Sequence, residues 1–208
     1  MKFKLLAIAL LICSFCAAQK EQFKFDFTSN KAQKGYIKID SSNRYTASKG
    51  YGYDLQPSSA GENKPFYFSV QVPDGNYKVT IRIGSKNKAG ITTVRGESRR
   101  LFIENLATKK GEVVEVTFII NKRNTKISEN EDVKIKQREK KKLNWDDKLT
   151  IEFNGDAPLV ESMTIQKVNN IPTVFLFGDS TVVDQDNEPW ASWGQMITRF
   201  FDMVHLVT

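Results

Sequence analysis

Cysteine and histidine are scarce in this sequence of 208 residues. The two cysteines, Cys13 and Cys16, fall within the first 18 residues, and the one histidine is His205. Once those 18 residues are removed, the chain has no thiol, which excludes a disulfide framework, a cysteine nucleophile and a cysteine metal site. No loop has the closely spaced carboxylates of a calcium site. We therefore expect a protein that is stabilised by packing alone and needs neither a metal nor another cofactor.

Long hydrophobic runs are missing after the first 20 residues. The chain starts "MKFKLLAIALLICSFCAAQK", in which two lysines precede a short apolar run and small residues precede Gln19. This order is typical of a secretory signal peptide, and the run is shorter than the roughly 20 residues that span a bilayer. The sequence predicts a signal peptide over residues 1–18, export to the periplasm or the exterior, and no membrane span.

The excess of positive charge is modest and local. The formal charge of +7 becomes +5 without Lys2 and Lys4, because 29 basic residues then face 24 acidic ones. Much of the excess lies in "VKIKQREKKKLNWDDK", at Lys134, Lys136, Arg138, Lys140, Lys141 and Lys142. This run predicts a solvated loop between two strands or a contact with an acidic polymer, and an acidic polysaccharide suits an exported protein better than DNA. No nucleic-acid-binding motif accompanies the run, so we expect no nucleic acid partner.

Alternation of apolar and polar residues dominates the chain up to residue 168, which is typical of strands. Eight segments show it: 23–27, 35–40, 66–72, 77–84, 99–106, 113–123, 149–155 and 161–168. Because no long helical pattern separates them, the sequence predicts an all-β sandwich over residues 21–168.

The segments 66–72 and 77–84 are joined by "PDGN", a turn sequence at residues 73–76. Each has one apolar face, made by Phe66, Phe68, Val70 and Val72 and by Tyr77, Val79, Ile81 and Ile83. This pattern predicts a β-hairpin.

Several aromatic and polar residues of the sandwich are predicted in loops: Tyr51, Tyr53, Trp145 and Asn154. Tyrosine and tryptophan rings can stack on the C–H face of a sugar, or they can complete the core. The motifs "GYGYDL" and "FYFSVQVPDGNYKVTIRIG" resemble the galactose-binding-like β-sandwich that precedes esterase domains in exported bacterial enzymes. The resemblance implies either a sugar-binding module or a spacer.

The pattern changes near residue 171, where a second domain is predicted over residues 171–208. "TVFLFGD" is apolar on both faces, which suits a parallel strand covered by helices. In "EPWASWGQMITRFF" five apolar residues recur at helical spacing, with Pro189 suited to a first turn: Trp190, Trp193, Ile197, Phe200 and Phe201.

Ser180 follows the predicted strand directly, at the edge where α/β folds present reactive groups. Gly178 lets the backbone pass tightly and leaves room for a substrate. The Ser180 N–H can help to stabilise an oxyanion beside the Ser180 hydroxyl. The alternative is that Asp179 and Ser180 end a strand with ordinary turn chemistry.

The longer motif decides between these readings. "FLFGDSTVVDQ" followed by "PWASWGQMI" resembles the first block of the SGNH, or GDSL, hydrolases, and within them the rhamnogalacturonan acetylesterases. The resemblance implies a mainly β chain, in which a β-sandwich precedes the first strand and helix of an α/β, flavodoxin-like hydrolase domain. It implies that Ser180 is the nucleophile and an oxyanion donor, with Gly178 and Asp179 as supporting residues, and that acetylated pectic polysaccharide is the substrate.

A serine hydrolase of this kind also needs a histidine base and a carboxylate that orients it. The family supplies both from a late D-x-x-H block. Asp202 and His205 have that spacing but occur where the second parallel strand should start, so we do not expect them to serve Ser180. The sequence reads as the front part of a longer esterase, inactive as a fragment.

Overall fold

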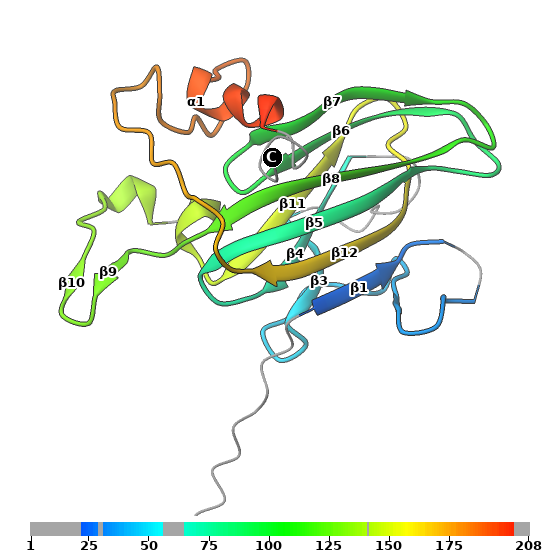
Figure 1. Cartoon of the computed structure of the whole chain (residues 1–208), viewed down its shortest axis with the longest axis horizontal. Helices are drawn as coiled ribbons and strands as arrows, with labels where there is room; N and C mark the ends of the chain where they lie inside the picture. The colour runs from blue at the N-terminus through cyan, green and yellow to red at the C-terminus, as the bar shows by residue number, and fades with distance from the viewer. Residues whose placement is uncertain (1–21, 29–30, 56–64, 141, 202–208) are drawn as a thin grey trace, which may run out of the picture.

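The computed structural model describes residues 22–28, 31–55, 65–140 and 142–201, and they form a mainly β structure (Figure 1). The predicted signal peptide, Lys141 and the pair Asp202 and His205 lie outside the described residues. No helix of the described part is long and apolar enough to cross a membrane.

Two five-stranded sheets pack face to face. The first has the order β2-β1-β12-β5-β8. Its strands are β1 (Gln22–Asp26), β2 (Ile37–Lys38), β5 (Gly75–Gly84), β8 (Val113–Lys122) and β12 (Val160–Val168). The second has the order β3-β4-β11-β6-β7. Its strands are β3 (Tyr51–Asp54), β4 (Phe66–Gln71), β6 (Gly90–Gly96), β7 (Arg100–Thr108) and β11 (Lys148–Asn154). All pairs are antiparallel except β1 with β2. The predicted sandwich is therefore formed.

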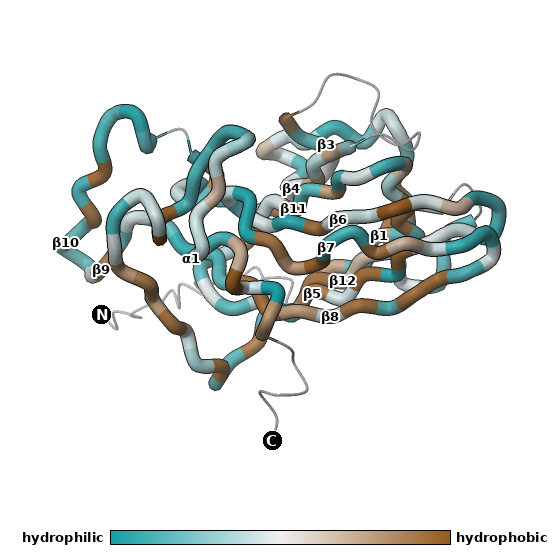
Figure 2. Tube along the Cα trace, turned by 90° about the horizontal axis from the view of Figure 1, so that it is seen from above, coloured by the Kyte–Doolittle hydropathy of each residue, from teal (hydrophilic) through white to brown (hydrophobic). Residues whose placement is uncertain are grey.

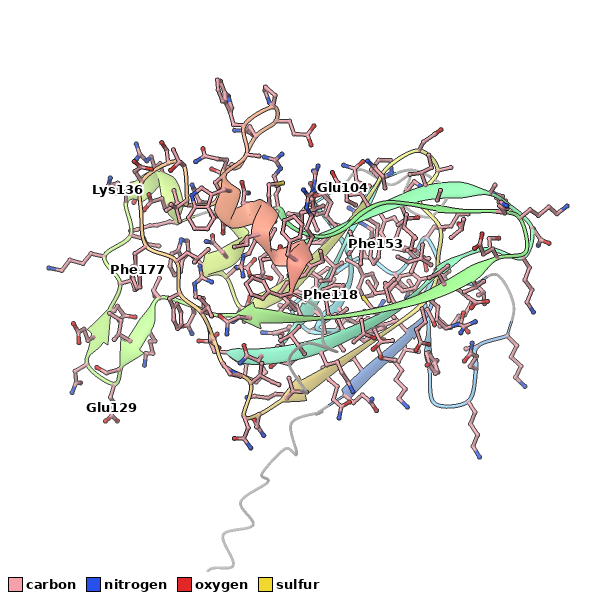
Figure 3. The ribbon with its side chains drawn as sticks, turned by 45° about the horizontal axis from the view of Figure 1, so that its top comes forward. Glu104, Phe118, Glu129, Lys136, Phe153 and Phe177 are labelled. Atoms are coloured by element: carbon pink, nitrogen blue, oxygen red, sulfur yellow. The ribbon has the colours of Figure 1, made fainter. Side chains whose placement is uncertain are left out.

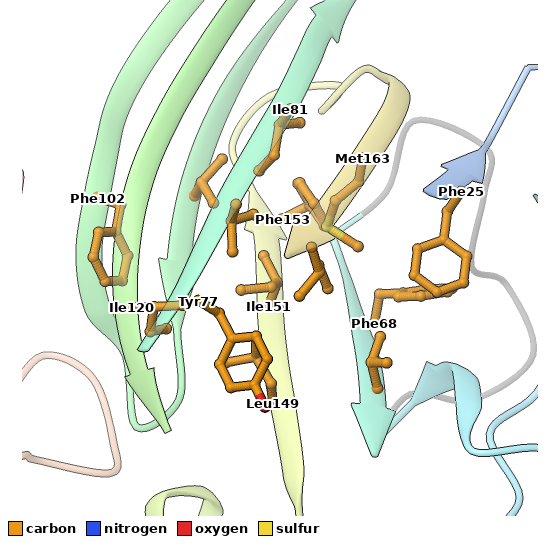
Figure 4. Packing of buried hydrophobic residues seen from close by; sticks show 14 of the residues in the cluster. Phe25, Phe68, Tyr77, Ile81, Phe102, Ile120, Leu149, Ile151, Phe153 and Met163 are labelled. Atoms are coloured by element: carbon orange, nitrogen blue, oxygen red, sulfur yellow. The ribbon is translucent and has the colours of Figure 1, made fainter. Parts of the chain in front are cut away.

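The core lies between the two sheets (Figure 4). The apolar faces predicted for residues 66–72 and 77–84 are both buried in it. Rings from opposite sheets meet there: Phe25 of β1 lies 4.9 Å from Phe68 of β4, and Phe102 of β7 stacks on Phe118 of β8 at 4.2 Å. Figure 2 shows the same pattern as hydrophobic colouring along the paired strands.

The predicted hairpin of residues 66–84 is wrong. Strand β4 pairs with β3 and β11, whereas β5 pairs with β12 and β8. The connection crosses from one sheet to the other, and Gly75 has a φ of +149°, which only glycine adopts readily. Alternation identifies the apolar face of each strand. Two strands can bury these faces as neighbours in one sheet, or as members of two sheets that pack face to face.

The aromatic residues predicted in loops lie elsewhere. Tyr51 and Tyr53 belong to β3, and Tyr53 is a core residue with 4% of its surface exposed. Trp145 is half-buried in the short 3-10 helix η2 (Leu143–Trp145), with the Arg123 guanidinium 5.5 Å from its ring centre. Asn154 ends β11. Tyr53 therefore belongs to the core and Tyr51 packs against it, whereas Trp145 and Asn154 are half-buried outside the core cluster.

The parallel strand predicted over residues 173–179 is not formed. The segment has no regular structure, and Val174, Phe175, Leu176 and Phe177 are 40–90% exposed. Among the described residues no strand pairs with this segment, and a strand that is apolar on both faces needs neighbours on each side.

The predicted helix is formed but is short and starts later than expected. Helix α1 (Trp193–Met196) continues as the 3-10 helix η3 (Ile197–Phe200). Its N-cap is Ser192, so Pro189 is not in its first turn. Trp190, Trp193 and Phe200 are exposed, and the helix contacts β7 instead through its polar residues (Figure 1).

Candidate functional site

Ser180 lies on an exposed turn that Asp179 organises. The carbonyl oxygen of Asp179 accepts hydrogen bonds from the N–H groups of Val182 and Val183, at 3.0 and 3.1 Å. Its carboxylate Oδ1 accepts from the Thr181 N–H at 2.9 Å and from the Thr181 hydroxyl at 2.8 Å. These two hydrogen bonds hold the pKa of Asp179 below its ordinary value. Turn chemistry is therefore present, and it leaves Ser180 at the surface.

The Ser180 hydroxyl is open on this turn. The Ser180 carbonyl oxygen accepts a hydrogen bond from the Gln185 side chain at 2.8 Å. Within the described residues, no hydrogen bond of the Ser180 hydroxyl is formed, no histidine is present, and no group of three potential metal ligands occurs. The turn thus fixes the backbone of Ser180 and leaves its side chain free to meet a substrate.

The space beside Gly178 is filled. A Cβ at Gly178 would overlap the Val182 side chain, and a Cβ at Gly194 would overlap the Val182 carbonyl group. The predicted room for a substrate next to Gly178 is therefore taken by Val182. The absence of a side chain at both glycines instead lets the Ser180 turn pack against the start of α1.

Hydrogen bonds also join the Ser180 turn to the start of α1. The Trp193 N–H donates to the Thr181 carbonyl at 3.0 Å, and the Ser192 hydroxyl donates to the Val182 carbonyl at 2.9 Å. Ser192 also accepts from the Gln195 N–H, while Gln195 Oε1 accepts from the Ser192 N–H, which is a reciprocal capping box. The turn and the helix form one local unit.

Gln195 fastens this unit to the sandwich. Its side chain is fully buried, and its Nε2 donates to the Ser98 carbonyl at 2.6 Å and to the Gln185 carbonyl at 2.9 Å. Ser98 belongs to the turn between β6 and β7. A continuous path of hydrogen bonds thus runs from the sandwich through Gln195 and Gln185 to the Ser180 carbonyl.

Arginines of the sandwich hold the loop between Ser180 and α1. Arg99 donates to the carbonyl oxygens of Gln185 and Trp190, at 3.2 and 3.0 Å. Glu188 pairs with Arg95 at 2.9 Å and with Arg99 at 3.4 Å, and the hydrogen bond from Arg95 lowers the pKa of Glu188.

The sequence comparisons bear on this site. No family model matches the chain. The chain resembles an uncharacterized esterase. This relative, YxiM of Bacillus subtilis strain 168, is 25% identical in an alignment that covers 89% of this chain and 49% of YxiM. The chain therefore spans about half the length of the curated relative it matches.

Two solved structures are also similar. The crystal structure of YxiM from Bacillus subtilis matches with 24% identity and a TM-score of 0.49, covering 89% of this chain and 52% of that one. A structure of the plant peptide RALF23 in complex with FER and LLG2 matches with 11% identity and a TM-score of 0.43, covering 75% of this chain and 42% of that one.

A cluster of buried charges surrounds Asp184, next to the Ser180 turn. Asp184 approaches Arg100, with 3.6 Å between Oδ2 and Nε, and accepts from Asn144 at 3.4 Å. Burial raises the pKa of Asp184, and this effect outweighs the positive charges of Arg100 and Arg123, which lower it. Glu97, which is 2% exposed, accepts from the Thr150 N–H at 3.0 Å, and burial raises its pKa to about 8.

A cavity of about 480 Å³ lies away from Ser180. Its wall includes Phe27, Tyr53 and Phe66, and its rim carries Lys31, Lys86 and Lys88. Tyr53 and Phe66 are core residues, so this cavity presents lysines rather than open aromatic faces.

Sequence reasoning predicted a role for Ser180, which stays a prediction, and missed the residues that hold its turn, namely Gln185, Gln195 and Arg99. The S-x-x-Q spacing of Ser192 and Gln195 is a visible capping signal. Nothing in the sequence pairs Arg99 with a loop about 90 residues away.

Proposed function

We propose that Ser180 is the nucleophile of an exported carbohydrate esterase of the SGNH type, similar to rhamnogalacturonan acetylesterases, that removes acetyl groups from pectic polysaccharide. The observation that carries the proposal is the open Ser180 hydroxyl on a turn whose backbone is held on both sides. The similarity to an uncharacterized esterase supports the hydrolase class.

The proposed reaction is acyl transfer. The Ser180 Oγ attacks the ester carbonyl carbon while a base takes the hydroxyl proton, and the Ser180 N–H donates to the oxyanion. The ester C–O bond then breaks, the proton passes to the leaving sugar oxygen, and an acetyl-serine remains. Water hydrolyses this ester by the same steps and releases acetate.

The base is the missing part within residues 22–201, because they contain no histidine. A general base must reach the hydroxyl directly or through one water. We therefore propose that a histidine outside residues 22–201, oriented by a carboxylate as in a D-x-x-H block, supplies the base.

The test compares acetate release from acetylated pectin by the protein of the whole reading frame with release by its Ser180→Ala variant. Loss of the nucleophile should lower kcat by roughly 10³-fold or more with an unchanged melting temperature. Ser41→Ala, another exposed serine, is the matched control and should keep full activity. Activity of Ser180→Ala equal to that of Ser41→Ala would end the proposal.

A binding role for the sandwich is the second candidate, supported by the 480 Å³ cavity with its lysine rim. A sugar that binds there raises the melting temperature by mass action. If no pectic glycan shifts the melting temperature, the sandwich is a spacer that holds the Ser180 turn, a role that the contacts of Gln195 and Arg99 favour.

A further inference from the structure

The connection between β8 and β11 projects from the sandwich. It contains the short hairpin of β9 (Lys126–Ser128) and β10 (Glu131–Asp132), and then residues 133–142, here named the basic arm (Figure 1). As predicted, the described residues of the arm, 133–140 and 142, form a largely exposed loop between strands, broken by the 3-10 helix η1 (Gln137–Glu139). Figure 2 shows largely hydrophilic colouring around β10 and the neighbouring chain.

The charges of the basic arm are not used by the fold. In sequence the arm has six cationic residues and one carboxylate, Glu139. Within the described part of the chain, Lys134, Lys136, Arg138 and Lys140 form no ion pair and are exposed or nearly so. Like charges this close repel one another, so the cluster costs stability instead of adding to it. A ligand that carries the opposite charge would remove that cost.

The root of the basic arm is attached to the Ser180 segment. The Lys142 ammonium pairs with Asp186 at 3.1 Å, six residues after Ser180. Asn144, 6% exposed, accepts from the Ser98 hydroxyl at 3.1 Å and donates to Asp184 at 3.4 Å. The arm and the Ser180 turn therefore share one anchoring region.

An exposed aromatic residue lies on the same side. Phe177 is 90% exposed, and Figure 3 shows Phe177 and Lys136 on the same side of the molecule. An open ring offers a stacking face for the C–H side of a sugar. The cations of the arm and the open Phe177 ring, on the same side of the molecule, suit a sugar polymer that carries carboxylates.

We propose that the basic arm binds the carboxylates of a polyuronate chain and holds this acidic polysaccharide beside the Ser180 turn. The choice of a polysaccharide rests in part on the proposed esterase function, whereas the charge argument stands without it. Nucleic acid is disfavoured because no nucleic-acid-binding motif accompanies the cations in the sequence, and it is kept as an outcome of the test.

The test measures the affinity of the Ser180→Ala protein for polygalacturonate by calorimetry at low and at physiological salt. One variant changes Lys134, Lys136, Arg138 and Lys140 to Gln. The matched control changes four exposed lysines that lie outside the arm and outside the lysine-rimmed cavity, Lys34, Lys109, Lys110 and Lys167, to Gln. The two variants differ in where the four charges are removed, not in how many.

The arm variant should bind polygalacturonate on the order of tenfold or more weakly, while the control variant binds as tightly as the parent. Added salt should weaken the binding of polygalacturonate to the parent more than to the arm variant, because salt screens the exposed charges of the arm. Neutral dextran should not bind. The control variant should keep the melting temperature, since its changed side chains are exposed, and the arm variant should melt at the same or a slightly higher temperature because the repulsion among its cations is removed.

Equal losses in the two variants would overturn the proposal by showing that net charge alone decides, and a loss in the control alone would overturn it by placing the ligand elsewhere on the sandwich. Tighter binding of single-stranded DNA than of polygalacturonate at equal salt would overturn the choice of polymer. Because binding is measured without turnover, a failed esterase proposal and a failed binding proposal give separate results.

Discussion

Gln195 is the side chain that ties the Ser180 turn to the sandwich. Each of its polar atoms is used: Nε2 for the carbonyl oxygens of Ser98 and Gln185, and Oε1 for the Ser192 N–H. A buried amide that satisfies three backbone groups is costly to replace, because each group left without a partner loses about 1–3 kcal/mol. Gln195 is thus a positioning residue for Ser180 rather than a catalytic one.

We expect Gln195→Leu, which keeps the size but removes the amide, to loosen the turn. The amides of Trp193 and Val182, which bond within the unit, should exchange with solvent roughly tenfold faster or more. The amides of β5 and β8 should keep their rates. Hydrogen exchange followed by mass spectrometry measures this.

Gln137→Leu is the matched control, since Gln137 is exposed in η1. It should leave all these rates unchanged. Unchanged exchange at Trp193 in Gln195→Leu would mean that Arg99 and the ion pairs hold the turn without the amide.

Strand β4 shows what separates a core residue from an exposed one of the same type. Phe68 has no exposed surface and contacts the rings of Phe25 and Phe27 at 4.9 and 5.1 Å. Phe177, in the segment for which a buried strand was predicted, is 90% exposed. The same residue type therefore has two very different effects on stability.

We expect Phe68→Ala to lower the free energy of unfolding by about 3–5 kcal/mol, because a buried ring leaves a cavity. Phe177→Ala should change it by no more than about 0.5 kcal/mol. Urea denaturation of both variants measures the difference. A large loss for Phe177→Ala would contradict its exposed position.

The strands themselves follow from the sequence. All eight alternating segments correspond to strands, although only Ile37 and Lys38 of residues 35–40 pair, as β2. Strands β3, β6, β9 and β10 were missed. "GYGYDL" and "GITTVRG" are rich in glycine, which weakens the alternation signal, and β9 and β10 are too short to show a period.

The two parts of the chain meet across buried charges. Arg100 of the sandwich lies 3.6 Å from Asp184 of the Ser180 segment, and the charges of Arg100 and Lys122 act on the buried Glu97. Burial is the dominant influence on the pKa of Glu97, and it favours the neutral form, while Arg100 and Lys122 favour the ionised form and Asp146 opposes it. The contact region between the sandwich and the Ser180 segment therefore responds to pH.

The direction follows from proton linkage. The pKa of Glu97 is about 8 in the folded protein and about 4.3 when unfolded. The folded state thus binds more protons between these values, and stability is full below the unfolded pKa and falls as pH rises towards 8. We expect the free energy of unfolding to fall by on the order of 1–3 kcal/mol from pH 5 to pH 8 because of Glu97.

Urea unfolding at pH 5 and pH 8 tests this with Glu97→Gln, which keeps the acceptor for Thr150. The decrease between the two pH values should be smaller in this variant than in the parent. Glu129→Gln, at the exposed tip of the β9–β10 hairpin (Figure 3), should behave like the parent. An equal decrease in all three proteins would remove Glu97 as the cause.

Local sequence was sufficient for eight of the strand positions, for the apolar faces of those strands and for the turn at Ser180, because each depends on residues close together in the chain. Whether Ser180 acts as a nucleophile stays a prediction. Only the tertiary structure decided that β4 and β5 lie in opposite sheets, that residues 173–179 form no strand, and that Gln195 and Arg99 hold the Ser180 turn. Those outcomes depend on contacts between residues far apart in the chain, where periodicity carries no information about the partner.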